Sequence, residues 1–198
     1  MPPYQIRQWD KTISFLLIFT FVKYFRFWVC FSLILFLDLV TKIWVVENSF
    51  ELRHYPITVL SGAEGQKSLI EFTYVTNPGA AWSMLSDYPM MLTILAGVAL
   101  CSIFVFRSQL EIIKPTNQII FGLICGGIAG NLIDRVFREP AAVVDFIDVF
   151  IPIIDYDYPV FNVADSGIFL GAFGYLIIGF LETKRAKQLE GNQAGIAK

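Results

Sequence analysis

The sequence has little charge and few of the residues that build metal sites or disulfide frameworks. Asp, Glu, Lys and Arg make up 16% of its 198 residues, and the net charge is −2. It has one histidine, His54, and three cysteines, Cys30, Cys101 and Cys125, which lie in apolar runs without a CxxC pair. Metal sites and disulfide frameworks need clusters of these residues, and nucleic-acid binding needs a basic surface. We therefore expect no metal and no nucleic-acid partner, and we predict no cofactor.

Apolar residues, in contrast, are abundant and gather in long runs. Hydrophobic residues make up 56% of the chain, against roughly 45–50% in a soluble domain. Each run is close to the roughly 20 residues that a helix needs to cross the hydrocarbon core of a bilayer. The four runs are 28–46, 88–106, 118–137 and 161–181. The sequence therefore predicts an all-α membrane protein, a bundle of four transmembrane helices.

The basic residues lie mainly on one side of these runs. The leading segment, the 107–117 link and the tail hold most of them, whereas the connections 47–87 and 138–160 hold mainly acids. Because cytoplasmic loops carry an excess of Lys and Arg, this asymmetry predicts that both termini are cytoplasmic. The two longer connections then face outward.

The ends of the chain lie outside the predicted 28–181 membrane domain. Residues 1–27 include the apolar stretch Thr12–Val22, which is too short to span a bilayer. We interpret it as an interfacial helix, with a fifth crossing as the alternative. Residues 182–198 are expected to form a cytoplasmic tail.

The first outer connection, about 47–87, has the pattern of a small antiparallel hairpin. Tyr55–Leu60 and Leu69–Thr76 are rich in β-branched and aromatic residues, and Ser61–Gly65 between them supplies turn residues. Pro78 and Gly79 then end the second strand. For the remaining outer segments the sequence predicts only a loop or a short helix.

Polar residues cluster near the outer ends of the apolar runs. A charge in mid-bilayer costs about 2.5–3.5 kcal/mol on insertion scales, so such residues usually face the bundle interior and serve function. The members of this cluster are Asp38, Lys42, Asn77, Asn131, Asp134, Arg135, Asp145, Asn162 and Asp165. Gly126, Gly127 and Gly130 form a small-residue surface that allows the third run to approach the fourth closely. The sequence therefore predicts a functional site near the outer membrane face.

Five motifs lie in this cluster: Asp38–Lys42 (DLVTK), Asn77–Ala81 (NPGAA), Gly126–Arg135 (GGIAGNLIDR), Val144–Phe146 (VDF) and Phe161–Asp165 (FNVAD). They occur in the order found in the lipoprotein signal peptidase (type II signal peptidase) family, which the chain resembles over about residues 28–181. The resemblance implies an intramembrane aspartic endopeptidase of the bacterial inner membrane. Its substrate would be a prolipoprotein, cut just before a diacylglyceryl-modified cysteine. Membrane lipid is the other expected partner, and the protein is expected to be a monomer.

The resemblance also implies roles for individual residues. Asp145 and Asp165 would be the catalytic pair, because two close carboxylates share a proton and can activate water together. Asn77, Asn131, Arg135 and Asn162 would hold the substrate. Asp38 and Lys42 are expected to form a buried ion pair, and Asp134 to support the structure or to orient Arg135. Trp82 departs from the family, which usually has phenylalanine there.

Three rival functions remain open at this stage. One is an ion-coupled carrier using Asp38, Asp134 and Asp165. Another is a protease with a Ser–Lys dyad, in which Lys42 activates Ser83 or Ser166. The third is a chaperone that binds prolipoproteins without cleaving them.

Overall fold

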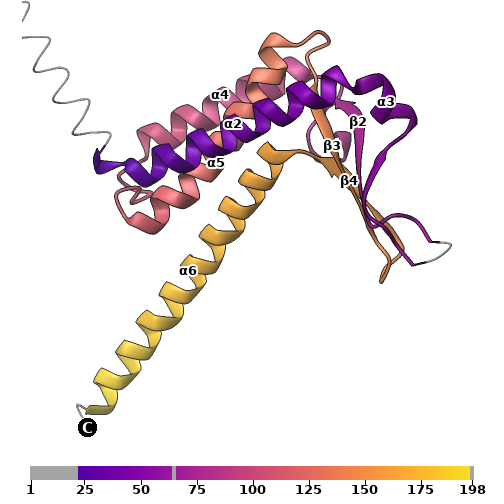
Figure 1. Cartoon of the computed structure of the whole chain (residues 1–198). Helices are drawn as coiled ribbons and strands as arrows, with labels where there is room; N and C mark the ends of the chain where they lie inside the picture. Colours follow the sequence, from indigo (N-terminus) through magenta and orange to yellow (C-terminus); the bar gives the residue numbers. More distant parts are fainter. Residues whose placement is uncertain (1–21, 64–65, 197–198) are drawn as a thin grey trace, which may run out of the picture.

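The computed structural model describes residues 22–63 and 66–196, which form a helical bundle with a small sheet at one end (Figure 1). The helices are α2 (Phe25–Glu47), α3 (Ser49–His54), η1 (Ala81–Ser83, a 3₁₀ turn), α4 (Pro89–Val105), α5 (Pro115–Phe137) and α6 (Val163–Ile196). The strands are β1 (Ile57–Leu60), β2 (Ile70–Asn77), β3 (Val143–Ile151) and β4 (Tyr156–Phe161). The predicted interfacial helix lies outside the described residues, except for Val22.

Helix α5 is the centre of the bundle. It packs against α2, α4 and α6, and α2 and α6 also touch. Figure 1 shows α2, α4 and α5 side by side, while the C-terminal end of α6 stands apart from them. The helix α6 also continues to Ile196, well beyond the predicted end of its span at residue 181.

Glycines bring α5 very close to its neighbours. A Cβ atom added to Gly126 would lie 2.8 Å from the backbone oxygen of Phe31 in α2. Gly127 faces the backbone oxygen of Ala164 in α6, and Gly130 faces the Asp38 carboxylate in α2. The sequence predicts contact between this surface and the fourth span; in the structure α5 uses the same surface to contact α2 as well.

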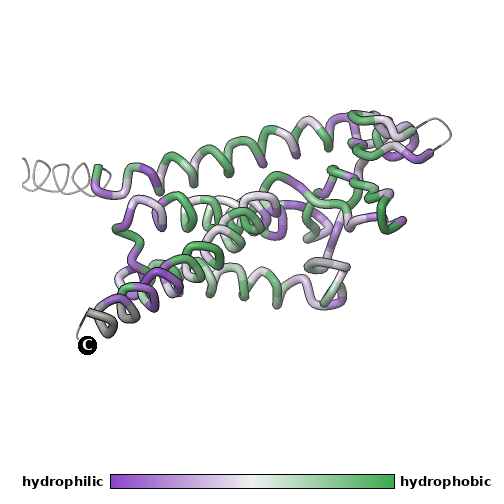
Figure 2. Tube along the Cα trace, turned by 90° about the horizontal axis from the view of Figure 1, so that it is seen from below, coloured by the Kyte–Doolittle hydropathy of each residue, from purple (hydrophilic) through white to green (hydrophobic). Residues whose placement is uncertain are grey.

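The outer surface of the helices is apolar, as expected for a membrane protein. Among the described residues, α2, α5 and α6 are long and apolar enough to cross a membrane, and α4 is also apolar but has only 17 residues. Exposed side chains on α2 include Leu33, Phe36, Leu37, Val40 and Ile43. In Figure 2 hydrophobic residues extend along the helices, and hydrophilic ones gather near the sheet and at the end of α6. A bilayer accounts for so much exposed apolar surface.

The four strands form one antiparallel sheet in the order β1-β2-β3-β4. The predicted hairpin is confirmed as β1 and β2. A short helix is present beside the hairpin as α3, and the connection 138–160, for which no strand was predicted, folds into β3 and β4 and completes the sheet. The fold is therefore helices with a small antiparallel sheet, and it is not purely α-helical.

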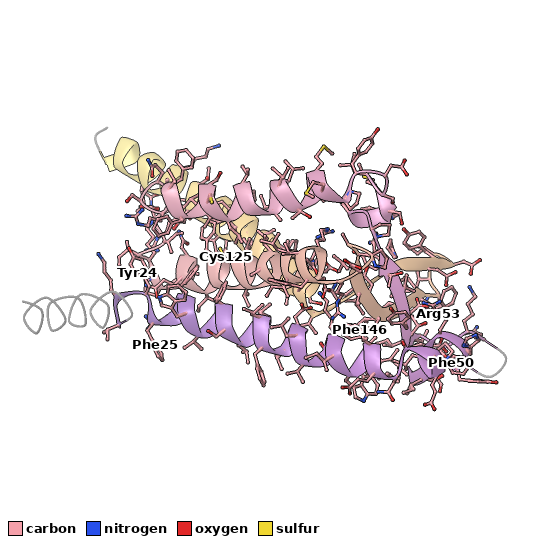
Figure 3. All side chains as sticks on the ribbon, turned by 90° about the horizontal axis from the view of Figure 1, so that it is seen from above. Tyr24, Phe25, Phe50, Arg53, Cys125 and Phe146 are labelled. Atoms are coloured by element: carbon pink, nitrogen blue, oxygen red, sulfur yellow. The ribbon has the colours of Figure 1, made fainter. Side chains whose placement is uncertain are left out.

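The sheet is fixed to the bundle by alternate residues of β3. Val144 and Phe146 are buried together with Val45 of α2 and Leu52 of α3. Because successive side chains of a strand point to opposite faces, Asp145 points away from this apolar cluster. Figure 3 shows Phe146 and Arg53 near the sheet, and Tyr24 and Phe25 at the opposite end of α2.

Candidate active site

Two carboxylates from different elements lie together at the junction of the sheet and the bundle. Asp145 is on β3, paired with Val75 of β2, and is 3% exposed. Asp165 lies in the first turn of α6 and is partly buried. One residue between them, Asn162, hydrogen-bonds to both.

Asn162 holds Asp165 through the start of helix α6. Its side-chain oxygen accepts a 2.8 Å hydrogen bond from the Asp165 backbone N–H, and the Asp165 carboxylate accepts a 3.2 Å bond from the Asn162 backbone N–H. This reciprocal arrangement is a capping box, which satisfies donors that a helix start leaves unpaired. The Asn162 amide nitrogen then donates to Asp145 Oδ1 at 2.7 Å. The helix start therefore fixes one carboxylate and binds the other.

Asn77 binds Asp145 from the opposite side. Its amide nitrogen lies 3.2 Å from Asp145 Oδ2, and its oxygen accepts a 2.9 Å hydrogen bond from the Gly79 backbone N–H. The tight turn after β2 thus orients the Asn77 side chain. Both oxygens of Asp145 receive an amide donor.

Asn131 binds Asp165 from α5. Its amide nitrogen donates to Asp165 Oδ1 at 2.7 Å, and its oxygen accepts from Lys42 Nζ at 2.9 Å and from Asn162 at 3.1 Å. All three asparagines predicted for the site therefore touch a carboxylate of the candidate pair.

Lys42 is the centre of a buried ion network beneath the pair. Its ammonium lies 2.8 Å from Asp38 and 2.9 Å from Asp134, and all three side chains are at most 1% exposed. Asp38 also accepts a 2.9 Å hydrogen bond from the Ala164 backbone N–H in the first turn of α6. The network thus ties α2, α5 and α6 together.

Of the two roles predicted for Asp134, its contacts fit support of the structure and not the orientation of Arg135. Asp134 binds Lys42, Arg138 and the backbone N–H of Val144. Neighbouring residues on a helix point in different directions, whereas residues four apart share a face. Asp134 therefore pairs with Arg138 and supports the strand that carries Asp145.

Arg135 lies at the edge of the site and binds backbone oxygens. It donates to Gly79 at 2.8 Å and to Asn131 at 3.4 Å. Its Nε atom is buried and has no hydrogen-bond partner. Such a donor is available to a group that enters the site.

The carboxylates open into a cleft of about 640 Å³ between α4, α5, α6 and the sheet. Polar groups lie at one end, and most of the lining is apolar. Residues at the polar end are Asn77, Asn131, Arg135, Asp145 and Asp165; apolar ones include Leu92, Leu95, Ile128, Ile168 and Phe169. Trp82 also lines the cleft, and its indole N–H donates to the Tyr156 hydroxyl at 3.2 Å. The cleft offers an apolar path toward two carboxylates.

Burial changes the acidity of Asp145. The loss of water around this carboxyl raises its pKa from 3.8 to about 7, and the nearby Asp165 carboxylate adds to the increase. Asp148, three residues further along β3, lies opposite Glu71 of β2 and does not bind Asp145 in the structure. The pair is therefore suited to hold one proton near neutral pH.

The geometry disfavours two of the rival functions. The Lys42 ammonium is bound to Asp38, Asp134 and Asn131, and the Ser166 hydroxyl donates to the backbone oxygen of Asn162. Lys42 is therefore not placed to activate Ser166, and Asp38 and Asp134 are already neutralised. Within residues 22–63 and 66–196, no three His, Cys, Asp or Glu side chains gather as metal ligands would.

Sequence reasoning missed several members of the site. It did not identify the backbone groups of Gly79, Val144 and Ala164, the tyrosine that binds Trp82, or the bond between Lys42 and Asn131. The cap could have been recognised, because Asn followed three residues later by an acid is a helix-start pattern. The Lys42–Asn131 bond joins residues 89 positions apart, and no local pattern indicates it.

Comparisons with known proteins show the family of the chain. A model of the family described as signal peptidase (SPase) II matches residues 30–181. The chain is 38% identical over 160 residues to a lipoprotein signal peptidase from Nostoc punctiforme, covering 79% of this chain and 90% of that protein. It is 35% identical over 167 residues to one from Syntrophomonas wolfei, covering 82% and 98%. The family resemblance is confirmed.

Solved structures are also similar. One, described as a bacterial membrane enzyme determined by the in meso method at 2.3 Å resolution, has a TM-score of 0.67 and 28% identity. The match covers 80% of this chain and 89% of the solved one. A second, of the same description at 1.9 Å, has a TM-score of 0.58, 28% identity, and coverage of 77% and 90%.

Proposed function

The chain belongs to the signal peptidase II family, and from that premise we propose that it cleaves signal peptides from bacterial prolipoproteins with Asp145 and Asp165 as its catalytic pair. The cut would lie just before a diacylglyceryl-modified cysteine. The observation that carries this proposal is the double role of Asn162, which binds Asp165 through the helix cap and Asp145 through its amide. The two carboxylates are thereby held at the wall of one cleft.

The proposed chemistry uses one water molecule and one shared proton. Asp165 accepts hydrogen bonds at both oxygens, and we assign it the role of the base. It would take a proton from water as the water oxygen attacks the scissile carbonyl carbon. Asp145, protonated up to about pH 7, would give its proton to the carbonyl oxygen.

Cleavage then requires the proton to reach the leaving group. As the tetrahedral intermediate collapses, the C–N bond breaks and the amine takes the proton held by Asp165. Asp145 recovers its proton from the hydroxyl of the intermediate as the new carboxyl group forms. The pair returns to its starting state, and no covalent enzyme intermediate is needed.

The substrate would contact other groups than the dyad. The amide nitrogens of Asn77, Asn131 and Asn162 are already bonded to the carboxylates, so we assign them first to holding the pair. Arg135 has a buried unpaired Nε donor and is suited to bind a carbonyl oxygen of the substrate backbone. The apolar part of the cleft would take the signal-peptide helix and its lipid.

The proposed membrane arrangement has four crossings. Helix α4, with 17 residues, is at the lower limit for a span and would cross beside α5. The basic residues then place both termini in the cytoplasm and the sheet outside. The active site lies near the outer face, and substrate enters sideways from the cytoplasmic (inner) membrane. A monomer would suffice, since each proposed catalytic group comes from one chain.

The test is cleavage of a purified lipid-modified prolipoprotein in detergent or lipid. We expect release of the signal peptide by the wild type and loss of at least roughly 10²–10⁴-fold in rate in Asp145→Asn and Asp165→Asn. Asp148→Asn is the matched control, because it removes a partly buried carboxyl from the same strand outside the cleft. Its rate should be close to wild type. Binding without release by the wild type would favour the chaperone, and full activity of either dyad variant would exclude the proposed mechanism.

A further inference from the structure

The three asparagines of the site can each be oriented from their partners. A side-chain amide can exchange its oxygen and nitrogen by a half turn, so a partner that only donates determines which atom faces it. For Asn77 that partner is the Gly79 N–H, and for Asn162 it is the Asp165 N–H. Both are backbone donors of a turn or a helix cap. The amide nitrogens must therefore face the carboxylates.

Asn131 is oriented differently, by a charged side chain. Its oxygen accepts from Lys42 Nζ at 2.9 Å. The lysine ammonium has three donors and no acceptor, and its other two partners are Asp38 and Asp134. The fully buried ammonium is thus held between two ion-pair partners and donates its hydrogen bond to Asn131. The second donor to this oxygen, Asn162, lies at 3.1 Å and is shared with Val144 and Asp145.

The orientation of Asn131 decides what Asp165 receives. With its oxygen on Lys42, Asn131 presents N–H to Asp165 Oδ1 at 2.7 Å. A flipped amide would set its oxygen against a carboxylate oxygen, two acceptors with no hydrogen between them. The Lys42 ammonium thus keeps an amide N–H, and not an amide oxygen, on the Asp165 carboxylate.

We propose that Lys42 is a positioning residue for the cleavage reaction, which fixes the Asn131 amide so that its N–H stays on the Asp165 carboxylate. This inference rests on the proposed function. It assigns to the buried ion network a role in catalysis beyond holding the helices together.

The other charged groups near Asp165 cannot replace Lys42 in this role. From α2, Asp38 is anionic; from α5, Asp134 is anionic; and from β3, Asp145 is the partner acid. Arg135 of α5 is a cation, but it binds the backbone oxygens of Gly79 and Asn131 and leaves the Asn131 side chain untouched. Lys42 is the cation among these groups that touches the amide bound to Asp165.

The test compares a double variant with a single one. Asp38→Asn/Lys42→Met removes one anion and one cation, so Asp134 keeps its partner Arg138 and the network stays balanced. An asparagine at position 38 still offers an oxygen to the Ala164 N–H. Asp38→Asn alone disturbs the same helices but keeps the Lys42–Asn131 bond. The rate of prolipoprotein cleavage is measured against pH for both, together with the melting temperature.

We expect the acid limb of kcat/KM to move upward by about one pH unit in the double variant, because the amide donor to the catalytic pair is no longer held in place. The charges removed at positions 38 and 42 offset each other. In Asp38→Asn the limb should stay or move downward, since the positive charge is then less compensated. A lower melting temperature with an unmoved limb in the double variant would overturn the proposal. An upward shift of the acid limb by the same amount in Asp38→Asn would also overturn the proposal. If the double variant does not fold, the acid limb of Asp38→Asn decides the outcome.

The dyad variants separate this inference from the proposed function. Inactive Asp145→Asn and Asp165→Asn proteins, together with a double variant whose limb is unmoved, would reject only the role of Lys42. Retained cleavage in either dyad variant would reject the proposed mechanism itself. Lys67→Met is the matched lysine control, because Lys67 forms an exposed pair with Asp157 on the sheet and should leave the profile unchanged.

Discussion

The Asn162 side chain donates a 2.7 Å hydrogen bond to Asp145 on β3 while it caps the helix that carries Asp165. The Asn162 amide thus makes both a local helix cap and a contact with a distant strand. The cap is set by a few neighbouring residues, and the contact needs the sheet to be folded. The geometry of the pair therefore depends on both.

Two substitutions of Asn162 separate these roles. Asn162→Ala removes the cap and the bond to Asp145, whereas Asn162→Ser keeps a capping oxygen but cannot reach Asp145. Both should lose roughly 10²-fold or more in activity, because the pair is no longer held together. The serine variant should be more stable than the alanine variant by about 1 kcal/mol, the usual value of a cap. Cleavage assays and thermal melts check this, and wild-type activity in Asn162→Ser would contradict it.

A second prediction concerns the close contact of α5 with α6. Gly127→Ala would push a methyl group into the Ala164 backbone at the start of α6, so both stability and cleavage should fall. Gly97→Ala in α4 is the matched control, because nothing lies within 4 Å of the added methyl group. Alanine is favoured over glycine in a helix by roughly 1 kcal/mol, so this control should be as stable as wild type or more so. Equal melting temperatures for Gly127→Ala and wild type would contradict the contact.

The helices could be predicted from the sequence, since long apolar runs carry their own signal. The strand β3 could not be predicted in this way. Its acids Asp145 and Asp148 are three residues apart, a spacing that does not fit strand alternation, and its pairing with β4 shifts between Ile147 and Val149. The polar cluster was predictable because charges near membrane spans are costly. The partners of these polar residues were not predictable, because bonds such as Lys42–Asn131 join segments that are distant in the sequence.

A third prediction concerns Arg135. Lysine keeps the positive charge but has no planar fork, so Arg135→Lys should lose the simultaneous bonds to Gly79 and Asn131. We expect kcat/KM to fall roughly tenfold or more, with little change in the melting temperature. Arg107→Lys, an exposed change at the other end of the bundle, is the control. An Arg135→Lys protein with wild-type kinetics would show that the Arg135 guanidinium does not bind the substrate.

A fourth prediction is that chelators leave cleavage unchanged. Asp38 and Asp134 are neutralised by Lys42 and Arg138, and Asp145 and Asp165 accept amide hydrogen bonds, so neither pair is free to bind a divalent ion. Activity with and without EDTA is compared, with a zinc protease in the same buffer as the positive control for chelation. Activity lost to EDTA and restored by a divalent cation would contradict the two-carboxylate mechanism.

The last prediction is the pH dependence that follows from Asp145. Burial, with a contribution from Asp165, raises its pKa from 3.8 to about 7. The proposed mechanism needs its proton, so kcat/KM should fall as the pH rises through about 7. The native state also holds this proton more tightly than the unfolded chain does. The stability that the proton provides is complete below pH 3.8 and is lost as the pH rises through about 7.

Two measurements check these expectations together. The kcat/KM profile of the wild type should show a basic limb near pH 7, and Asp148→Asn should show the same limb. Melting temperatures of the wild type should decline relative to Asp145→Asn between pH 4 and about 7, because only the wild type loses this proton in that range. If the difference in melting temperature between wild type and Asp145→Asn stayed constant across this pH range, Asp145 would ionise like an exposed carboxyl. The proton donor would then have to be the other aspartate.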